Sequence, residues 1–279
     1  MYEPKYLPSF EEEAVSLGGI RFAIVHANKY IPQNNPDADP MHVHKYLEIF
    51  FNLSSDVSFF VNNTLYPVSV GHALVSRPDD IHMAVFHGSA VQEHLCIWVE
   101  AESASPLLSF AYKDDFFPLF SFDEQTAKRF RTLACSLLEA TAKGGSPLKK
   151  MSCLLQILTL FENEQTERTE RLSLPESFQR VLDYIHDNLA QIRCVSDIVS
   201  ALYVSSATLT RWFRKHLNTS PREYLESVRL SHAAVLLTNG SSVTEASMLS
   251  GFSDCSHFIV LFKRRFGVTP LKYKKKQSL

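Results

Sequence analysis

Short apolar runs separated by turn-forming residues make up the front of the chain. Over residues 19–100 the runs are rich in Val, Ile, Phe and Trp, and clusters of Asn, Asp, Pro and Gly stand between them. Several short strands at this spacing are typical of a β-sandwich or a small barrel. We therefore predict a β domain over residues 1–120.

The hydrophobic pattern changes to a helical period near residue 122. Apolar side chains recur at helical spacing over residues 123–142 and again over 148–162, and GGSP at 144–147 separates the two runs. We predict a helix pair over residues 121–162. Its apolar stripe is wide enough to pack on the β domain and on a second copy of the chain, so dimerisation and packing within one chain both stay open.

A polar stretch over residues 163–177 that ends near a proline predicts a linker. Beyond it the pattern is helical over residues 178–276, and it repeats. At an offset of 49 residues, LTRWFRKHLNTSPREYL (209–225) matches FIVLFKRRFGVTPLKYK (258–274) at phenylalanine, basic, proline and tyrosine positions. A repeated supersecondary unit is the natural explanation of such a match.

Each repeat has the pattern of a short helix, a tight turn and a second helix. In the first repeat the second helix, over residues 206–217, has an apolar inner face and a polar, basic outer face. In the second repeat Ser242 and Glu245 fit a capping box that begins the short helix, and Gly251 marks the turn. Two helix-turn-helix units are therefore predicted. A helix of about 17 residues joins them, spans roughly 25 Å and can hold them about one turn of DNA apart.

Charge is unevenly distributed, although the net charge is only −2. Residues 171–279 carry 15 basic and 8 acidic residues, whereas residues 1–170 carry 13 basic and 22 acidic residues. A basic domain is the electrostatic footprint of a protein that binds the phosphate backbone of nucleic acid. From charge alone, a solvated basic face explains the excess equally well.

The residues of both repeats resemble a known family. The stretch SVTEASMLSGFSDCSHFIVLFKRRFGVTPLKY (242–273) closely resembles the signature at the end of the AraC/XylS family of bacterial transcription regulators. The stretch SSATLTRWFRKHLNTSPREYLESVRLSHAAVLL (205–237) resembles the first helix-turn-helix and the linker helix of that family. The resemblance implies a seven-helix DNA-binding domain over residues 178–276 that places two helices in successive major grooves of double-stranded DNA.

The resemblance also assigns the side chains that face DNA. Arg211 is the candidate for a bidentate contact to a guanine, which discriminates by about 1–3 kcal/mol. A phosphate contact or an internal salt bridge is its alternative role. The second helix has little capacity to hydrogen-bond bases, since Val260 stands where the family often has arginine, and Lys263, Arg264 and Arg265 remain for phosphates. We therefore expect specificity from the first helix and affinity from the second. The predicted DNA-binding residues are Ser206, Ala207, Thr208, Thr210, Arg211, Arg214, Lys215, Cys255, Ser256, Ile259, Val260, Lys263 and Arg264.

With the C-terminal domain identified, the β domain resembles the cupin-like sensor domain of the same family. HVHKYLEIFF (42–51) is similar to the first cupin motif, and VGHALVSRPDDIH (70–82) is similar to the second. Metal-binding cupins ligate one ion with the residues that match His42, His44, Glu48 and His82. Alternate residues of a strand share a face, so His42, His44 and Glu48 can point into one cavity. Three imidazoles and a carboxylate suit Fe, Mn, Ni or Zn.

Two positions depart from the family's patterns. Asp80 stands where the second cupin motif usually has glycine, and Asn218 replaces a glycine that is common after the first of the two DNA-facing helices. Because Asn tolerates the left-handed backbone conformation, we expect the turn at Asn218 to survive.

Three interpretations of the histidines stay open: they line an effector pocket, they are satisfied structural side chains, or they hold a metal. We adopt the first, because an aromatic-rich surround fits an apolar pocket with a few polar groups. The aromatic side chains are Phe50, Phe51, Phe59, Phe60 and Trp98. The predicted effector-binding residues are His42, His44, Glu48, His82 and Trp98, and no metal, cofactor or catalytic residue is assigned.

The expected fold is α+β and multidomain. It consists of an N-terminal cupin-like β-barrel with a helix pair, followed by an all-α DNA-binding domain of two helix-turn-helix units joined by a long helix. The expected function is that of a sequence-specific DNA-binding transcription regulator, not an enzyme, whose cupin domain senses a small-molecule effector. The alternatives are a cupin metalloenzyme fused to a DNA-binding domain, and a constitutive DNA-binding protein with a structural cupin domain. A homodimer is expected, with RNA polymerase as a partner if the protein is an activator.

The expected location of the protein and the redox environment of its cysteines follow from features that the sequence lacks. No apolar run reaches about 18 residues, so no transmembrane helix and no membrane partner are expected. The N-terminus has neither the basic start nor the apolar core of a signal peptide. Five cysteines, an odd number without a CxxC pair, argue against a disulfide framework or a zinc finger. These features predict a protein of the reducing cytoplasm.

Overall fold

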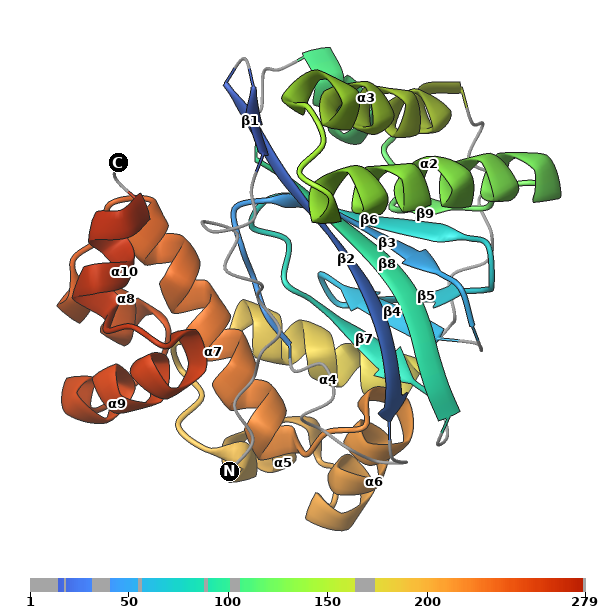
Figure 1. Cartoon of the computed structure of the whole chain (residues 1–279). Helices are drawn as coiled ribbons and strands as arrows, with labels where there is room; N and C mark the ends of the chain where they lie inside the picture. Colours follow the sequence, from blue (N-terminus) through green and yellow to red (C-terminus); the bar gives the residue numbers. More distant parts are fainter. Residues whose placement is uncertain are drawn as a thin grey trace.

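Two antiparallel sheets form the N-terminal part of the computed structural model (Figure 1). The structure describes residues 15–17, 19–31, 41–54, 57–87, 90–100, 106–163 and 174–277. The larger sheet has the strand order β1 (Val15–Leu17), β2 (Ile20–Ile31), β8 (Ala90–Glu100), β3 (Leu47–Asn52), β6 (Ala73–Ser76) and β9 (Leu119–Phe120). The smaller sheet has the order β5 (Thr64–Val68), β4 (Val57–Val61) and β7 (His82–Phe86).

The two sheets face each other across a shared hydrophobic core. Phe50 of β3 and Trp98 of β8 enter this core from the large sheet, and Phe59 of β4 and Phe86 of β7 enter it from the small sheet. The described strands hydrogen-bond as two separate sheets, and no ladder among them closes a continuous barrel. The predicted β-barrel is therefore corrected to a pair of facing sheets. An isolated antiparallel bridge between His42 and His82 links the chain just before β3 to β7.

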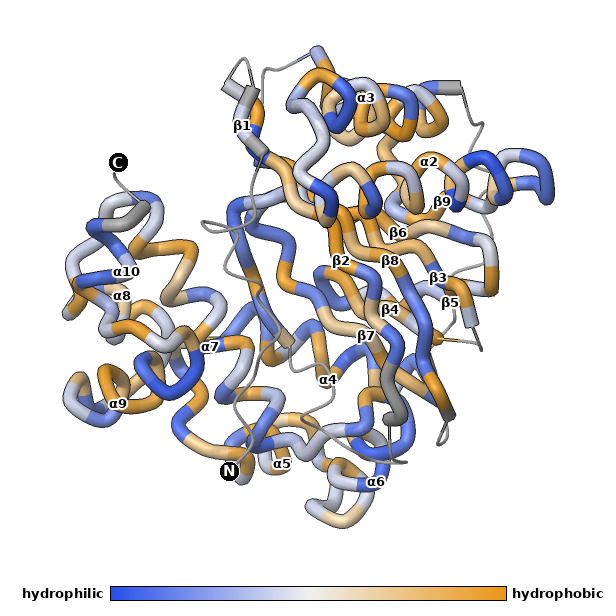
Figure 2. The backbone as a smooth tube through the Cα atoms, viewed as in Figure 1, coloured by the Kyte–Doolittle hydropathy of each residue, from blue (hydrophilic) through white to orange (hydrophobic). Residues whose placement is uncertain are grey.

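Helices α2 (Glu124–Ala142) and α3 (Pro147–Asn163) cover the outer face of the large sheet (Figure 1). Because successive strand residues point to opposite faces, Ile49 and Phe51 lie in this outer core while Phe50 lies in the inner one. Phe51 stacks on Phe130 of α2 with ring centroids 4.2 Å apart. In Figure 2, β2 and β8 are hydrophobic where they pass beneath these helices, and a hydrophilic stretch of β8 follows farther from them. The apolar stripe of the helix pair thus packs within the chain.

Seven helices occupy residues 174–277, as the resemblance implied. They are α4 (Glu176–Asp187), α5 (Val195–Leu202), α6 (Ser206–Leu217), α7 (Pro221–Thr238), α8 (Val243–Leu249), α9 (Cys255–Phe266) and α10 (Pro270–Gln277). Helices α6 and α9 have equal lengths and begin 49 residues apart. The first prolines of α7 and α10, Pro221 and Pro270, are also 49 residues apart, although α7 is longer than α10. The sequence repeat is therefore a repeat of structure. A 3-10 helix, η1 (Pro106–Tyr112), precedes β9.

The turns of the two units follow the predicted chemistry. The predicted capping box forms at the start of α8, where Ser242 accepts the backbone N–H of Glu245 and the Glu245 side chain accepts the backbone N–H of Ser242. Ser220 and Glu223 form the same pair of bonds at the start of α7. Asn218 is left-handed with φ of 51°, as expected for the position where glycine is common. Gly251 has φ of +82°, and a Cβ there would lie 2.4 Å from the carbonyl oxygen of Leu189. That turn therefore requires glycine.

The outer face of the small sheet packs against the C-terminal domain. Phe60 of β4 and Met83 of β7 share a buried core with α4, α6 and α7. Asn218 Nδ2 donates a hydrogen bond to the carbonyl oxygen of Phe86 at 2.7 Å, and the Tyr224 hydroxyl donates to Asn63 Oδ1 at 3.3 Å. The fold therefore runs from the helix pair through the large and small sheets to the DNA-binding domain. Residues 164–173, most of the predicted linker, lie outside the described residues.

Candidate functional site

The outer face of α6 presents the polar and basic side chains that were predicted to contact DNA. Ser205 caps the helix by accepting the backbone N–H of Thr208, and its hydroxyl donates to Thr208 Oγ1 at 2.9 Å. Leu209, Phe213 and Leu217 are buried, which fixes the rotation of the helix. The predicted residues Ser206, Ala207, Thr210, Arg211, Arg214 and Lys215 are exposed, and Thr208 is half-buried.

Among the basic side chains of α6, Arg214 lies near an acidic side chain of the next helix. Arg214 Nη2 lies 3.9 Å from Glu223 Oε2, at the capped start of α7. Burial raises the pKa of Glu223, but hydrogen bonds from Ser220 outweigh it and leave this pKa below its usual value. Glu223 is therefore an anion at neutral pH. An exposed pair at this distance contributes little energy, so Arg214 can exchange it for a phosphate at small cost.

Helix α9 presents fewer polar groups toward solvent. Asp254 caps the helix by accepting the backbone N–H groups of Ser256 and His257. Val260 is 63% exposed, so this helix presents an apolar side chain to solvent at a predicted DNA-facing position. Ser256, Lys263 and Arg264 are also exposed, and Cys255 and Ile259 are half-buried.

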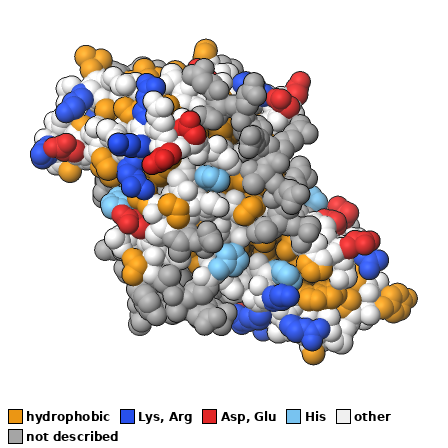
Figure 3. Space-filling model, turned by 90° about the vertical axis from the view of Figure 1, so that its right-hand side faces the viewer, with side chains coloured by type: hydrophobic (Ala, Val, Ile, Leu, Met, Phe, Trp, Pro, Cys, Tyr) orange, Lys and Arg blue, Asp and Glu red, His pale blue; other side chains and the backbone are white. Residues whose placement is uncertain are grey.

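Two arginines at the end of α9 already have partners within the chain. Arg264 Nη2 lies 2.9 Å from Glu226 Oε1 of α7. Arg265 is half-buried and donates to the carbonyl oxygen of Met41, in the N-terminal domain. The expectation that Arg265 serves DNA phosphates is therefore corrected, because the side chain points toward the domain interface. On the face drawn in Figure 3, the visible Lys and Arg side chains lie in separate groups.

A second site lies between the two sheets, where His42, His44, Glu48 and His82 meet. The ligand atoms of these four side chains all lie within 4.8 Å of one another. His44, Glu48 and His82 are at most 5% exposed, whereas His42 is half-buried. Backbone bonds fix the relation of His42 and His82, whose N–H groups each donate to the other's carbonyl at 2.9 and 3.0 Å. We call these four residues the His–Glu cluster.

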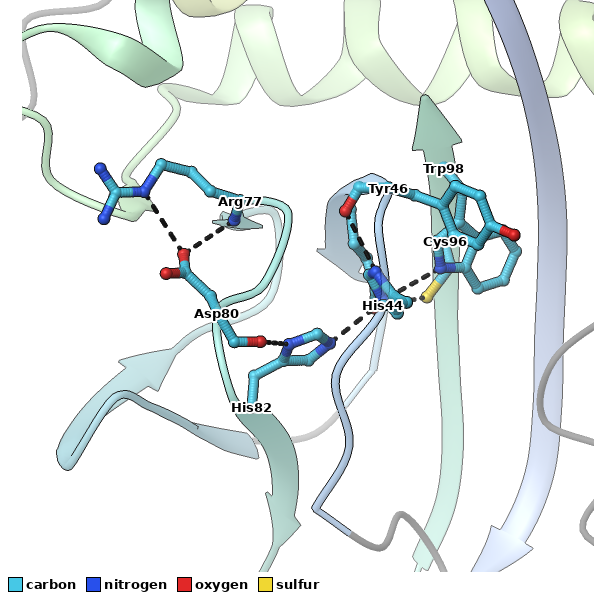
Figure 4. Close-up of polar contacts among 8 residues, drawn as sticks. His44, Tyr46, Arg77, Asp80, His82, Cys96 and Trp98 are labelled. Atoms are coloured by element: carbon cyan, nitrogen blue, oxygen red, sulfur yellow. Dashed lines mark hydrogen bonds and ion pairs between the residues drawn. The ribbon is translucent and has the colours of Figure 1, made fainter. Parts of the chain in front are cut away.

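Carbonyl groups set the orientation of two of the imidazoles (Figure 4). His44 Nδ1 lies 3.1 Å from the carbonyl oxygen of Tyr46, and His82 Nδ1 lies 2.8 Å from that of Asp80. A carbonyl only accepts hydrogen bonds, so each Nδ1 carries a proton. The Nε2 atoms then face Glu48 Oε2, at 2.8 Å from His44 and 3.6 Å from His82. Second-shell carbonyls fix ligand histidines in metal sites in this way.

Glu48 holds a buried negative charge. Burial raises its pKa, but hydrogen bonds and charges of His44 and His82 outweigh burial, so the pKa lies well below its usual value. Trp98 Nε1 donates to Glu48 Oε2 at 2.8 Å, and Cys96 Sγ lies 3.7 Å from Glu48 Oε1. A buried carboxylate with imidazole nitrogens turned toward it requires positive charge nearby. Protons on the histidines or a metal ion both meet this requirement.

The turn before β7 aims His82 into the cluster. Asp80 Oδ2 accepts the backbone N–H of Arg77 at 2.8 Å, and Asp80 Oδ1 accepts from Asn62 Nδ2 at 2.6 Å. The left-handed residue of the turn is Asp79, with φ of 67°. Asp80 therefore occupies the usual glycine position of the motif without backbone strain, and its side chain ties the turn to the β4–β5 connection.

The structure brings all five predicted effector-binding residues together, but only part of the predicted aromatic surround. Phe50, Phe59 and Trp98 lie in the inner core beside the cluster. Phe51 faces the helix pair, and Phe60 faces the DNA-binding domain. Cys96 beside Glu48 was not predicted. The donor set of three imidazoles and one carboxylate fits a divalent first-row transition metal, with His42, His44, Glu48 and His82 as its ligands.

Comparison with known proteins agrees with the helical repeat. A family model described as a helix-turn-helix domain matches residues 198–276. The chain is 25% identical over 265 residues to the HTH-type transcriptional regulator YdeC of Bacillus subtilis (strain 168), covering 89% of this chain and 90% of that protein. It is 22% identical over 244 residues to the HTH-type transcriptional activator RhaR of Mannheimia succiniciproducens, covering 84% and 87%.

Among solved structures, the chain is similar to ToxT from Vibrio cholerae O395. That likeness has 14% sequence identity and a TM-score of 0.35, and it covers 92% of this chain and 97% of ToxT. The family model and the two equal helical units define a helix-turn-helix DNA-binding protein. Over most of its length the chain is similar to HTH-type transcriptional regulators, and its residues 198–276 match a helix-turn-helix domain. Among the described residues, no helix is both long and apolar enough to cross a membrane.

Proposed function

We propose that this transcription regulator is controlled by an effector bound at the His–Glu cluster. The observation that carries the proposal is the double role of β7. His82 lies on its inner face in the cluster, while Met83 and Val85 lie on its outer face. Those two residues share a buried core with Phe213 of α6, the first DNA-facing helix. Only strand β7 therefore separates an effector bound at the cluster from α6, the helix proposed to read DNA.

The division of labour between the DNA-facing helices belongs to the same proposal. Helix α6 offers exposed hydroxyl groups and Arg211 to base edges, which supports a role in sequence recognition. Helix α9 exposes the apolar Val260 and, near its end, Lys263, which supports a role in affinity through phosphates. We further assign no enzymatic step to the cluster. Action in the cytoplasm, dimerisation through the helix pair α2 and α3, and, if the protein is an activator, contact with RNA polymerase complete the proposal.

Substitutions on the two helices test the assignment. A preferred duplex is first selected from a randomised pool with the full-length protein, and binding is then measured by fluorescence anisotropy. Arg211→Ala should lose about 1–3 kcal/mol of discrimination at one base pair. Lys263→Ala should weaken binding to all duplexes alike and lower the slope of log affinity against log salt by about 1.

Lys113→Ala is the matched control, because Lys113 is an exposed lysine that follows η1 and belongs neither to the helix pair nor to a DNA-facing helix. It should bind as the wild type does. An equal loss of specificity in the Arg211 and Lys263 variants would contradict the division of labour. Failure of the wild type to prefer any duplex would contradict the proposed function itself.

A further inference from the structure

Tyr203 stands in the turn of the first helix-turn-helix unit, between α5 and α6. Its backbone is left-handed, with φ of 54°. Every other left-handed residue among the described ones is Gly, Asn or Asp, the types that adopt this conformation most readily. A bulky side chain in this conformation costs stability, so the local backbone does not explain why a tyrosine stands here.

Packing does not explain Tyr203 either. The residue is 96% exposed, the largest value among the exposed large hydrophobic residues that the structure describes. In the second unit the left-handed residue of the turn is Gly251, where a Cβ would meet the carbonyl oxygen of Leu189. The first turn has room for a side chain, because the side chain of Tyr203 points into solvent. A strained residue that buries nothing indicates a functional position.

The turn holds Tyr203 in a fixed place. The backbone N–H groups of Tyr203 and Val204 both donate to the carbonyl oxygen of Val199, the second of them at 3.3 Å. Val204 packs against the core of the first unit, and Ser205 caps α6. The exposed ring therefore projects from a backbone that is anchored on both sides.

Tyr203 lies beside the end of α6 that is proposed to enter DNA. The N-terminal residues of a recognition helix contact base edges in the major groove. Tyr203 comes three positions before Ser206, the first residue of α6 and a predicted DNA-binding residue. The chain that leads into such a helix passes the sugar–phosphate backbone at the edge of the groove. A tyrosine hydroxyl is among the groups that donate hydrogen bonds to phosphate oxygens.

We infer that Tyr203 is a further DNA-binding residue, whose hydroxyl donates a hydrogen bond to a phosphate beside the groove that α6 occupies. This inference rests on the proposed function, because it needs α6 to lie in the major groove. A phosphate carries no sequence information, so the contact strengthens binding to every duplex alike. The left-handed backbone of Tyr203 then lowers the stability of the turn in order to place a hydroxyl group at this point.

Two substitutions in the full-length protein separate DNA binding from stability. Tyr203→Phe keeps the ring and the left-handed backbone but removes the hydroxyl. Anisotropy should show a Kd about fivefold or more higher for the selected duplex and for an unrelated one, with an unchanged melting temperature. Tyr203→Gly removes both the ring and the strain, so its melting temperature should rise by roughly 1–4 °C while its Kd rises at least as much.

Neutral phosphate analogues locate the contact. Methylphosphonate groups replace the phosphates of the selected duplex one at a time, and each duplex is measured with the wild type and with Tyr203→Phe. At the phosphate that Tyr203 binds, the replacement should weaken the wild type by about fivefold but the variant by less than about twofold. Replacements elsewhere should weaken both proteins equally.

Tyr112→Phe is the matched control, because Tyr112 is an exposed tyrosine that ends η1 in the N-terminal domain. This variant should bind every duplex as the wild type does. If Tyr203→Gly does not fold, Tyr203→Phe alone carries the test of binding, because it leaves the backbone and the ring as they are.

Each contrary result is distinct. Equal Kd values for the wild type and Tyr203→Phe overturn the contact and leave the proposed function standing. A weaker Tyr203→Phe variant that responds to every methylphosphonate as the wild type does also overturns the contact. A lower melting temperature in Tyr203→Gly overturns the account of strain. A wild type that prefers no duplex overturns the proposed function and the inference together.

Discussion

Glu48 and Trp98 form a cross-strand pair inside the N-terminal domain. They lie directly opposite each other where β3 pairs with β8, and the indole N–H donates to the carboxylate at 2.8 Å. Hydrogen bonds to a charged group stabilise more than neutral ones do. Trp98 is therefore placed to stabilise the buried charge of Glu48 from the strand opposite.

Replacing the indole tests this contact. Trp98→Phe removes the N–H donor and should lower the free energy of unfolding by about 1.5–3 kcal/mol more than Trp212→Phe does. The chain has only these two tryptophans, and Trp212 packs on Phe178 of α4, which makes it the natural control. Urea unfolding followed by circular dichroism measures the difference. Equal losses in the two variants would show that the hydrogen bond adds nothing beyond packing.

At the residue scale, the sequence identified the members of the His–Glu cluster but not their partners. Alternation along a strand grouped His42, His44 and Glu48, and the resemblance to the second cupin motif added His82. Cys96 lies on β8, 48 positions after Glu48, and only strand pairing brings the two together. Arg265 looked like a phosphate contact because basic side chains end both DNA-facing helices. Its contact with Met41 depends on how the domains dock, which no local pattern records.

At the scale of elements, the sequence repeat was the strongest predictor of the two helix-turn-helix units. Helices α6 and α9 keep the same length and inner apolar face, so the offset of 49 residues located both units. Capping boxes at Ser220 and Ser242 fixed the starts of α7 and α8. The way the strands of the β domain pair was harder to predict, because they form two facing sheets and not one barrel. Sheet closure depends on pairing between distant strands, which alternation of apolar residues does not specify.

The turn between α8 and α9 offers a test of backbone chemistry. Gly251→Ala should destabilise the protein by more than Gly240→Ala. Both glycines have positive φ, so each variant should lose about 1–2 kcal/mol from the left-handed conformation. At Gly251 the new methyl group also meets the carbonyl oxygen of Leu189, whereas at Gly240 nothing lies within 4 Å. Thermal unfolding of both variants measures the difference, and equal melting temperatures would contradict this reading of the turn.

On the scale of the whole molecule, the small sheet belongs to two cores. Phe59 faces the large sheet, while the neighbouring Phe60 faces the DNA-binding domain. A strand with apolar residues on both faces indicates burial on both sides. That pattern is visible in the sequence as DVSFFVN (56–62), yet it does not say what covers the second face. Docking of the C-terminal domain there could be learned only from the structure.

Asn218 is a test of that docking. Asn218→Gly keeps a residue that adopts the left-handed turn but removes the hydrogen bond to Phe86. A hydrogen bond of this kind contributes about 0.5–1.5 kcal/mol, so the domain interface should open more often. Amide hydrogen exchange should rise in β7 and in α6 while protection beneath α2 and α3 is unchanged. Asn239→Gly, at the exposed end of α7, is the control and should leave exchange in β7 as it is.

The shared core around Phe60, Met83 and Met41 limits how this protein can be recombined. A chimera that joins its sensor domain to the DNA-binding domain of a relative places those three side chains against foreign helices. Apolar contacts that do not match leave cavities or clashes, each of which costs stability. The set of residues that must be exchanged together is therefore larger than either domain. Exchange of sensors between relatives has to carry the facing residues of α4, α6 and α7 with them.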